Sequence, residues 1–566
     1  MKSNFHKILF ILTMLVFVIL LAQTLWHPLK FKKLEGVTDK VELPSLNFKD
    51  FSDGSYQSKL DTYLSNNYGF REFTIRLYNQ YIWSAYKKEN VDHIVAGKEG
   101  WLFYKHHVDD YYGQEMYRWQ KDSKTAIERY EREIRLMKKL RGVLKEYDIE
   151  FLVFVAPDKA FIYPEYLPEQ EYDTTTIYAR DYYVKRLTEE GFPNIDMTEM
   201  FIRMSDTTDY ILMPSKGAHW NNTCVYGVDT LLRLMENLTG DNLAKFSYGE
   251  AVPSYRYLNV ETDIEEYLNI LFEDPIDKKF ETKERLFTIK SDSTTFKPNV
   301  LFVGNSYLFQ VYDYIPINQI FSDINHWYYN HTSYSGFKRK KNDISEIDRL
   351  KTILNSDYVV WYTDGCQMYK TSYGFVEDAL IRLCVEDDKI NKVRNIVTDS
   401  IYKEKISMMR NSDSVIDSVA IRKEINKSVG SIIKSDPERY YDELSGPEIP
   451  TIRTKRTEKL IIEKQIVADS NWMKTLNVYA QKSYMSIDEV VELEVDNILN
   501  NNELIKDKGF SEEDVSYALE ISKVISEIKN NEKLLKQIEQ KAIKNNKTLE
   551  QAIIDDAKWI IKNRKK

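Results

Sequence analysis

Three short, almost purely apolar runs limit the fold of this chain more than any other feature. They are "IEFLVFVA" (149–156), "NVLFV" (299–303) and "DYVVWYT" (357–363). Runs this continuous are typical of strands that are buried on both faces, as in a parallel sheet. Stretches with helical periodicity lie between them, for example at 124–147 and 178–191. Strands that alternate with helices predict an α/β fold, with a mainly parallel sheet between helical layers.

The N-terminus predicts a membrane helix. Residues Ile8–Trp26 carry no charge, and a run of about 20 apolar residues spans a bilayer. The length of the run and the interfacial Trp26 favour an uncleaved anchor over a signal peptide, although Ala22 leaves cleavage open. Lysines flank the run on both sides, so they give no clear orientation. We expect one anchoring helix, with the soluble part outside the cytoplasm on the periplasmic or extracellular face.

The rest of the chain divides by composition. After the anchor (1–26) we expect a juxtamembrane stalk and helix (27–95), interrupted at "NNYG", then the α/β domain (96–398). A helical C-terminal region (399–566) follows, in which Lys, Glu, Asn and Ile dominate.

The C-terminal region contains an internal repeat, because residues 472–499 align with 534–561. Each copy predicts a helix, a turn with a Ser or Thr N-cap, and a second helix. A bundle that packs on itself is favoured over a groove that holds a partner.

Composition excludes some functions. The formal charge of −9 argues against a nucleic-acid partner. The three cysteines form no CxxC pair, so we expect no metal site, and no motif indicates a cofactor. The 40 tyrosines suit a sugar-binding surface without demonstrating one.

The candidate nucleophile is Ser306, in "VGNS" directly after the second apolar run. In open α/β sheets, ligands bind beyond the carboxyl ends of strands. Gly304 permits a sharp turn there, and backbone N–H groups at the start of the next helix can hold an oxyanion. A Gly-Asn-Ser turn by itself is more often only a turn.

The candidate base is His219 in "KGAHWNN". We expect it to face Ser306 across one cleft, because both should lie at the carboxyl edge of the same sheet. No acid is adjacent. Asp206 and Asp209, upstream, are the candidates for the carboxylate that orients the imidazole, and each could equally be a solvated turn residue; a backbone carbonyl is the remaining choice.

Four segments in order add a family resemblance: "GKEGWLFY" (97–104), "FVAPDKAFIYPEYLP" (154–168), "GAHWNNTCVYGV" (217–228) and "LFVGNSYLF" (301–309). Over about 45–395 the chain resembles the permuted SGNH-hydrolase proteins, which include alginate-acetylation proteins and the DHHW family. The resemblance implies a three-layer α/β/α domain. It implies that an Asp-x-His-Trp motif supplies acid and base and that a Gly-Asp-Ser motif supplies the nucleophile. His219 would then be the base, Ser306 the nucleophile, and Gly304 and Asn305 would lie at the oxyanion site.

Two departures from the family pattern keep the function open. The acid position is Gly217, and the residue before the serine is Asn305. The chain could use a Ser-His dyad, recruit Asp206 or Asp209, or be inactive. Loss of the orienting acid alone can cost ~10⁴ in rate.

Lys159, in "PDK", is expected to form a salt bridge.

The favoured function is O-acetyl transfer or ester hydrolysis on a cell-envelope polysaccharide or another acetylated carbohydrate, with a membrane acyltransferase or assembly protein as a possible partner. The rival is a degenerate SGNH-like protein that binds sugar or acts as a scaffold in envelope assembly. An esterase for small soluble esters would explain neither the tether nor the helical region.

Overall fold

The computed structural model describes residues 2–36, 41–113, 123–171, 177–253, 261–384, 454–545 and 547–564. The expected N-terminal part of the C-terminal region, 399–453, lies outside them. The chain divides into two compact units. The first comprises Met1–Lys138, Glu150–Ile347 and Tyr358–Phe375, and the second comprises Lys139–Ile149, Asp348–Asp357 and Val376–Lys566.

The N-terminal helix α1 covers Lys2–Trp26, and its segment His6–Trp26 is long and apolar enough to cross a membrane. It is followed by α2 (Phe48–Ser52), α3 (Ser55–Asn67) and α4 (Arg71–Tyr86). The break between α3 and α4 falls at the predicted "NNYG". Gly69 packs there against the end of α1, because a Cβ at Gly69 would lie 2.4 Å from the backbone of Gln23.

A seven-stranded sheet in the order β10-β9-β8-β7-β11-β3-β4 forms the centre of the first unit. The five strands from β8 to β4 are parallel, and β9 and β10 are antiparallel at one edge. The three predicted strands are therefore confirmed, as β3, β7 and β11. The strands are β3 (Glu150–Ala156), β4 (Asn194–Asp196), β7 (Asn299–Gly304), β8 (Asp323–Tyr328), β9 (Thr332–Ser335), β10 (Lys340–Asp343) and β11 (Tyr358–Asp364).

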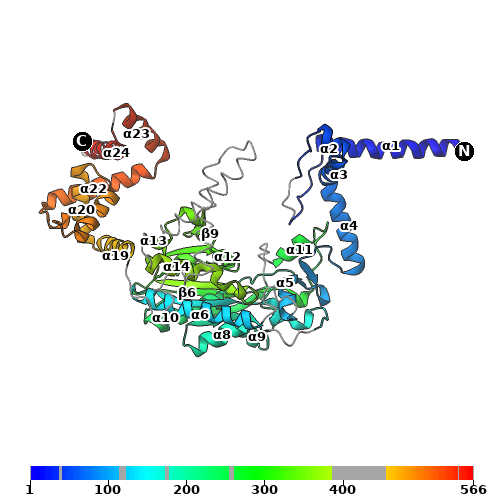
Figure 1. Cartoon of the computed structure of the whole chain (residues 1–566), viewed down its shortest axis with the longest axis horizontal. Helices are drawn as coiled ribbons and strands as arrows, with labels where there is room; N and C mark the ends of the chain where they lie inside the picture. Colours follow the sequence, from blue (N-terminus) through cyan, green and yellow to red (C-terminus); the bar gives the residue numbers. More distant parts are fainter. Residues whose placement is uncertain are drawn as a thin grey trace. The chain divides into compact units, whose positions relative to one another are not determined.

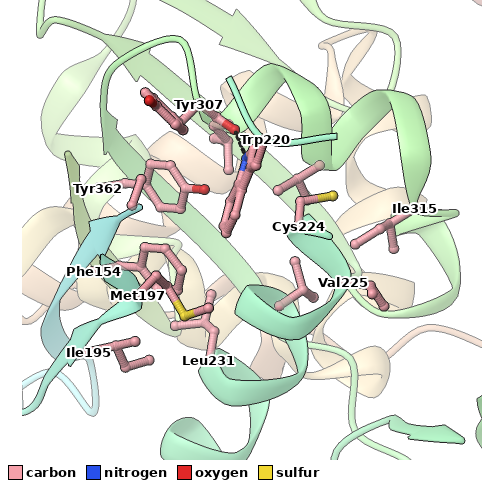
Figure 2. Close-up of a cluster of buried hydrophobic side chains, with 14 of the residues drawn as sticks. Phe154, Ile195, Met197, Trp220, Cys224, Val225, Leu231, Tyr307, Ile315 and Tyr362 are labelled. Carbon is pink, nitrogen blue, oxygen red and sulfur yellow. Dashed lines mark hydrogen bonds between the residues drawn. The ribbon is translucent and has the colours of Figure 1, made fainter. Parts of the chain in front are cut away.

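Alternate residues of the central strands enter two apolar layers. On one face, Phe154, Phe302 and Tyr362 pack with buried side chains of the helix that follows His219. Figure 2 shows this cluster, with Trp220 between Tyr362 and Cys224. On the other face, the Trp361 ring meets that of Tyr183 with centroids 5.6 Å apart. Helices cover both faces, so the three-layer α/β/α architecture is confirmed.

The sequence patterns also locate two of the longer helices. The region predicted at 124–147 is α6 (Ser123–Lys145), and the one at 178–191 is α8 (Ala179–Glu189). The helix after His219 is α10 (Cys224–Thr239), so His219 lies on the preceding loop. The other helices here are α5 (Lys105–Tyr111), α7 (Lys159–Ile162), α9 (Met197–Ser205), α11 (Asp263–Tyr267), α12 (Leu308–Tyr314), α13 (Arg349–Leu354) and α14 (Phe375–Cys384).

Two small antiparallel sheets lie outside the central sheet in the described part of the chain. β1 (Ile94–Ala96) pairs with β2 (Leu102–Tyr104) on either side of "GKEG". β5 (Lys245–Pro253) pairs with β6 (Lys283–Lys290).

The C-terminal part of the second unit is helical (Figure 1). Its helices are α19 (Lys455–Ala468), α20 (Ser470–Ser483), α21 (Ile487–Leu499), α22 (Glu512–Lys529), α23 (Glu532–Lys544) and α24 (Leu549–Arg564). The repeated hairpins are α20–α21 and α23–α24. Ser486 caps α21 in a capping box with Glu489, and Thr548 and Gln551 exchange the same pair of hydrogen bonds. Each hairpin, with the helix before it, buries an apolar cluster of its own, as expected of a bundle that packs on itself.

Candidate active site

Ser306 lies in a tightly held turn at the carboxyl end of β7. A Cβ at Gly304 would lie 1.6 Å from the Tyr362 carbonyl oxygen, so only glycine allows β7 and β11 to approach this closely. Asn305 N donates to that same oxygen at 3.2 Å. Asn305 Oδ1 in turn accepts from the backbone N–H of Tyr307 at 3.2 Å. These contacts place Ser306 beyond the edge of the sheet, before α12.

His219 meets Ser306 as the sequence predicts. His219 Nε2 lies 2.7 Å from Ser306 Oγ. Tyr307 joins the two segments, because its hydroxyl donates to Ala218 O at 2.9 Å and its own carbonyl accepts from Trp220 Nε1 at 2.9 Å. Figure 2 shows the indole nitrogen of Trp220 directed at Tyr307. The loop with the imidazole and the turn with the hydroxyl are thus tied to each other on both sides of the pair.

The carboxylate on the other imidazole nitrogen is Asp263, which the sequence analysis missed. Asp263 Oδ2 lies 2.5 Å from His219 Nδ1. Asp263 Oδ1 accepts from the backbone N–H of Ala218 at 2.7 Å, which fixes the rotation of the carboxylate. Three side chains from separate segments therefore form one hydrogen-bonded line, Asp263–His219–Ser306.

The two predicted acids do not contact His219, so that prediction was wrong. The side chain of Asp209 is 82% exposed and pairs with Lys283 at 2.8 Å. Asp206 is exposed at the end of α9. Asp263 follows His219 by 44 residues and stands at the start of a five-residue helix. Nothing in "ETDIEEY" separates this aspartate from its acidic neighbours, so only the fold identifies it.

A buried ion pair docks α11 beside the histidine loop. Lys216 Nζ lies 2.8 Å from Glu265 Oε1, and both side chains are nearly inaccessible. Lys216 O also accepts from the backbone N–H of Ile264 at 3.2 Å. Burial raises the pKa of Glu265 although Lys216 opposes the rise. Gly217 occupies the position of the family's acid, and the carboxylate on His219 comes from α11 instead.

Lys159 holds the same loop by hydrogen bonds to backbone carbonyls. Its Nζ donates to Leu102 O at 2.7 Å and to the carbonyls of Ser215 and Gly217 at 2.8 Å each. The expected salt bridge is therefore replaced by three backbone acceptors. Burial lowers the pKa of Lys159 well below its ordinary value. Gly217 contributes an acceptor here, where the family motif has a carboxylate.

The line of three residues remains open to solvent. The side chains of His219 and Asp263 are 16% and 21% exposed, and Ser306 is half-buried. In the part of the chain that the structure describes, the buried Asn305 Nδ2 has no hydrogen-bond partner. The imidazole can accept the Ser306 proton while Asp263 holds its other nitrogen, which is the geometry of an activated serine.

Comparison with known proteins finds a family model that matches part of this unit. Residues 94–224 match the family model described as "SGNH hydrolase-like domain, acetyltransferase AlgX". This part of the chain is thus similar to an SGNH hydrolase-like domain. The matched stretch includes His219 and ends at Cys224, before Asp263 and Ser306. No curated protein matches the chain.

Solved structures similar to this chain include AlgJ, AlgX and PatB1. The O-acetyltransferase domain of AlgJ from Pseudomonas putida is 14% identical, with a TM-score of 0.31, covering 49% of this chain and 92% of that one. AlgX from Pseudomonas aeruginosa is 13% identical, with a TM-score of 0.31 and coverages of 53% and 71%. PatB1 from Bacillus cereus is 11% identical, with a TM-score of 0.26 and coverages of 43% and 92%.

Proposed function

We propose that the SGNH-like domain transfers O-acetyl groups to a cell-envelope polysaccharide, or removes them, through an acyl-enzyme on Ser306. The observation that carries this proposal is the line Asp263–His219–Ser306, with contacts of 2.5 Å and 2.7 Å. The acetyltransferase family model over 94–224 supports the choice of acyl group.

The reaction follows from the contacts. Ser306 Oγ attacks the acyl carbonyl carbon while His219 Nε2 takes its proton, and Asp263 stabilises the imidazolium that forms. His219 then returns the proton to the departing alcohol or other leaving group, which leaves an acyl-serine. A sugar hydroxyl attacks next in transfer, or water in hydrolysis, and His219 accepts its proton. The bond between the acyl carbon and Ser306 Oγ then breaks, and Ser306 Oγ takes the proton back from His219.

The negative oxygen of the tetrahedral intermediate requires donors near Ser306. The Ser306 backbone N–H and Asn305 Nδ2 are the groups we assign, because Asn305 Nδ2 is buried without a partner among the described residues. Gly304, which the family resemblance places at this site, shapes the turn that presents both donors. Where the family has an aspartate, whose carboxylate only accepts hydrogen bonds, the Asn305 amide supplies a donor without a charge.

We further propose the setting in which this chemistry takes place. Helix α1 would anchor residues 1–26 in the membrane, with 27–95 as the stalk, 96–398 as the catalytic domain and 399–566 as a helical region that could contact an assembly partner. The soluble part would lie on the periplasmic or extracellular side. A membrane acyltransferase would supply the acetyl group, which a tethered domain is placed to receive.

The rival proposal, a degenerate scaffold, rested on the missing acid at Gly217. Asp263 at His219 Nδ1 removes that argument, so the enzyme is the function that the geometry favours. Neither proposal names the sugar.

The test compares Ser306→Ala and His219→Ala with the wild-type chain on a chromogenic acetyl ester and on an acetylated polysaccharide, with circular dichroism to check folding. Both variants should lose on the order of 10⁴-fold or more in kcat, to similar residual rates, because members of one catalytic unit are not additive. Ser247→Ala, which alters another half-buried serine on β5, should retain activity.

Two further results would decide between enzyme and scaffold. Intact-mass analysis after reaction with the ester should show one acetyl group on the wild-type chain and none on Ser306→Ala. A wild-type chain with no turnover on any acetylated substrate, with or without an acyl donor, would refute the enzyme and leave the scaffold.

A further inference from the structure

A cluster of two histidines and a cysteine lies at the carboxyl edge of the same sheet, apart from Ser306. His106 and His107 are consecutive on α5, and Cys366 follows β11, the strand that pairs with β7. His107 and Cys366 are buried, and one ligand atom of each of these three residues lies within 4.8 Å of the other two. The proposed acyl transfer uses none of them.

The distances within the cluster match those around a small tetrahedral cation. His107 Nε2 lies 3.6 Å from Cys366 Sγ, and Cys366 Sγ lies 3.5 Å from Asp364 Oδ1. Asp364 Oδ2 is 3.9 Å from His107 Nε2. Zinc bonds of about 2.0–2.3 Å to nitrogen, oxygen and thiolate ligands give tetrahedron edges of about 3.3–3.6 Å. His107, Cys366 and Asp364 therefore already stand close to the separations that one zinc ion needs, and a ligand atom of His106 lies within 4.8 Å of those of His107 and Cys366.

A carboxylate outside the cluster forms an ion pair with one of the histidines, which is an independent sign of a metal site. Asp158 Oδ1 lies 3.1 Å from His107 Nδ1, and the Asp158 side chain is fully buried. Histidines that bind zinc usually have such a carboxylate on the nitrogen that does not bind the ion, because it fixes the ring and its tautomer. Here it leaves Nε2 facing Cys366 and Asp364.

We propose that His106, His107, Cys366 and Asp364 bind one Zn²⁺ ion in a closed, structural site. Two imidazoles, a thiolate and a carboxylate form a borderline-soft ligand set that suits zinc better than magnesium or calcium. Four protein ligands leave no position for a substrate, so the ion would tie α5 to the end of β11. The Cys366 thiol would release its proton to solvent as the sulfur–zinc bond forms.

The first experiment measures zinc in the full-length chain, purified in detergent and dialysed against micromolar zinc and then against metal-free buffer. We expect about one zinc per chain in the wild type and in Cys224→Ser, and less than a tenth of that in Cys366→Ser. Cys224 is the matched control, a buried cysteine on α10 whose thiol donates to the Gln310 carbonyl at 3.7 Å. Equal zinc in Cys366→Ser, or none in the wild type, would overturn the proposal.

The second experiment does not depend on how well a variant folds. Cobalt(II) added to the metal-free wild-type chain should give intense visible bands of a tetrahedral site and a sulfur-to-cobalt charge-transfer band in the near ultraviolet. One equivalent of zinc should remove both. Bands that are weak and octahedral, or that lack the sulfur transition while zinc competes, would show that Cys366 is not a ligand and would refute this site.

Discussion

His219 and His107 make the same pair of contacts and differ in their surroundings. Each has an aspartate on Nδ1, at 2.5 Å for His219 and at 3.1 Å for His107. Each has a side chain that can ionise near Nε2, the Ser306 hydroxyl at 2.7 Å or the Cys366 thiol at 3.6 Å. The side chain of His219 is 16% exposed and that of His107 is 8% exposed, and the aspartates differ more, at 21% and 0%.

The comparison shows that an Asp-His pair does not by itself define a function. Beside His219 there is one oxygen nucleophile, solvent access and a buried amide donor from Asn305, which together suit acyl transfer. Beside His107 there are a sulfur atom, a second imidazole and a second carboxylate in a closed space, which together suit a cation. The groups around each pair, and access to it, decide its chemistry.

The largest effect we predict comes from exchanging the two aspartates for asparagine, one at a time. Asp263→Asn should lower kcat by about 10⁴-fold, because the amide favours the wrong tautomer of His219 and cannot stabilise its charged form. Asp158→Asn should cost far less activity and instead weaken zinc binding by about 10–100-fold. Ester kinetics and zinc competition with a chelator would measure the two effects.

Asp209→Asn is the control for this prediction, since Asp209 is exposed and pairs only with Lys283. Its kcat should stay within about twofold of the wild-type value, as expected for a surface substitution. If Asp158→Asn lost as much turnover as Asp263→Asn, the two histidines would have to work as one catalytic unit. That result would contradict the separate roles assigned to His219 and His107.

A smaller effect concerns the pKa values of buried carboxyl groups, one beside His107 and one near Asp263. Burial would raise the pKa of Asp158, but His107 outweighs it, so that pKa is lowered. Glu261, two residues before Asp263, is held by Asn221 and Thr282 at 2.9 Å and 3.1 Å. Burial raises its pKa from 4.5 to about 7 in the folded chain.

The sign of the resulting pH dependence follows from proton binding. Between pH 4.5 and about 7 the folded state holds a proton on Glu261 that the unfolded state has released, so the free energy of unfolding falls as pH rises through this window. The full penalty, present above pH 7, is at most about 3 kcal/mol. Glu261→Gln should therefore melt higher than the wild type at pH 8 and equally at pH 5. An identical increase at both pH values would contradict the assignment.

Much of the fold could be predicted from the sequence because it depends on local patterns. The apolar runs located β3, β7 and β11, and Ser486 and Thr548 located the repeated hairpins, since strand burial and helix capping are properties of adjacent residues. The approach of His219 to Ser306 was predicted too, although His219 lies on the loop before α10 and not directly after a strand.

The missed residues depend on contacts between distant segments. Asp263 reaches His219 from a five-residue helix that the pair of Lys216 and Glu265 ties to the histidine loop, and no pattern near His219 in the sequence predicts that helix. Cys366 and His107 are 259 residues apart, so a search for cysteine pairs at short spacing could not relate them. Lys159 was expected to find a carboxylate, yet the fold surrounds it with three carbonyls.

The smallest effect tests whether that docking positions the acid. Glu265→Gln keeps an oxygen acceptor for Lys216 and for the backbone N–H of Asp274, which contact Glu265 Oε1 at 2.8 Å and 3.2 Å, but removes the charge. Looser docking of α11 should weaken the contact of Asp263 with His219. We expect kcat to fall about tenfold, or ~1.4 kcal/mol of transition-state stabilisation, with a smaller change in KM. Glu266→Gln is the matched control on the same helix, since Glu266 is 35% exposed and lies 4.0 Å from Lys32. A merely structural Glu265 would lower the melting temperature and leave kcat unchanged below that temperature. Equal kinetics in the two variants would show that α11 holds Asp263 without the buried pair.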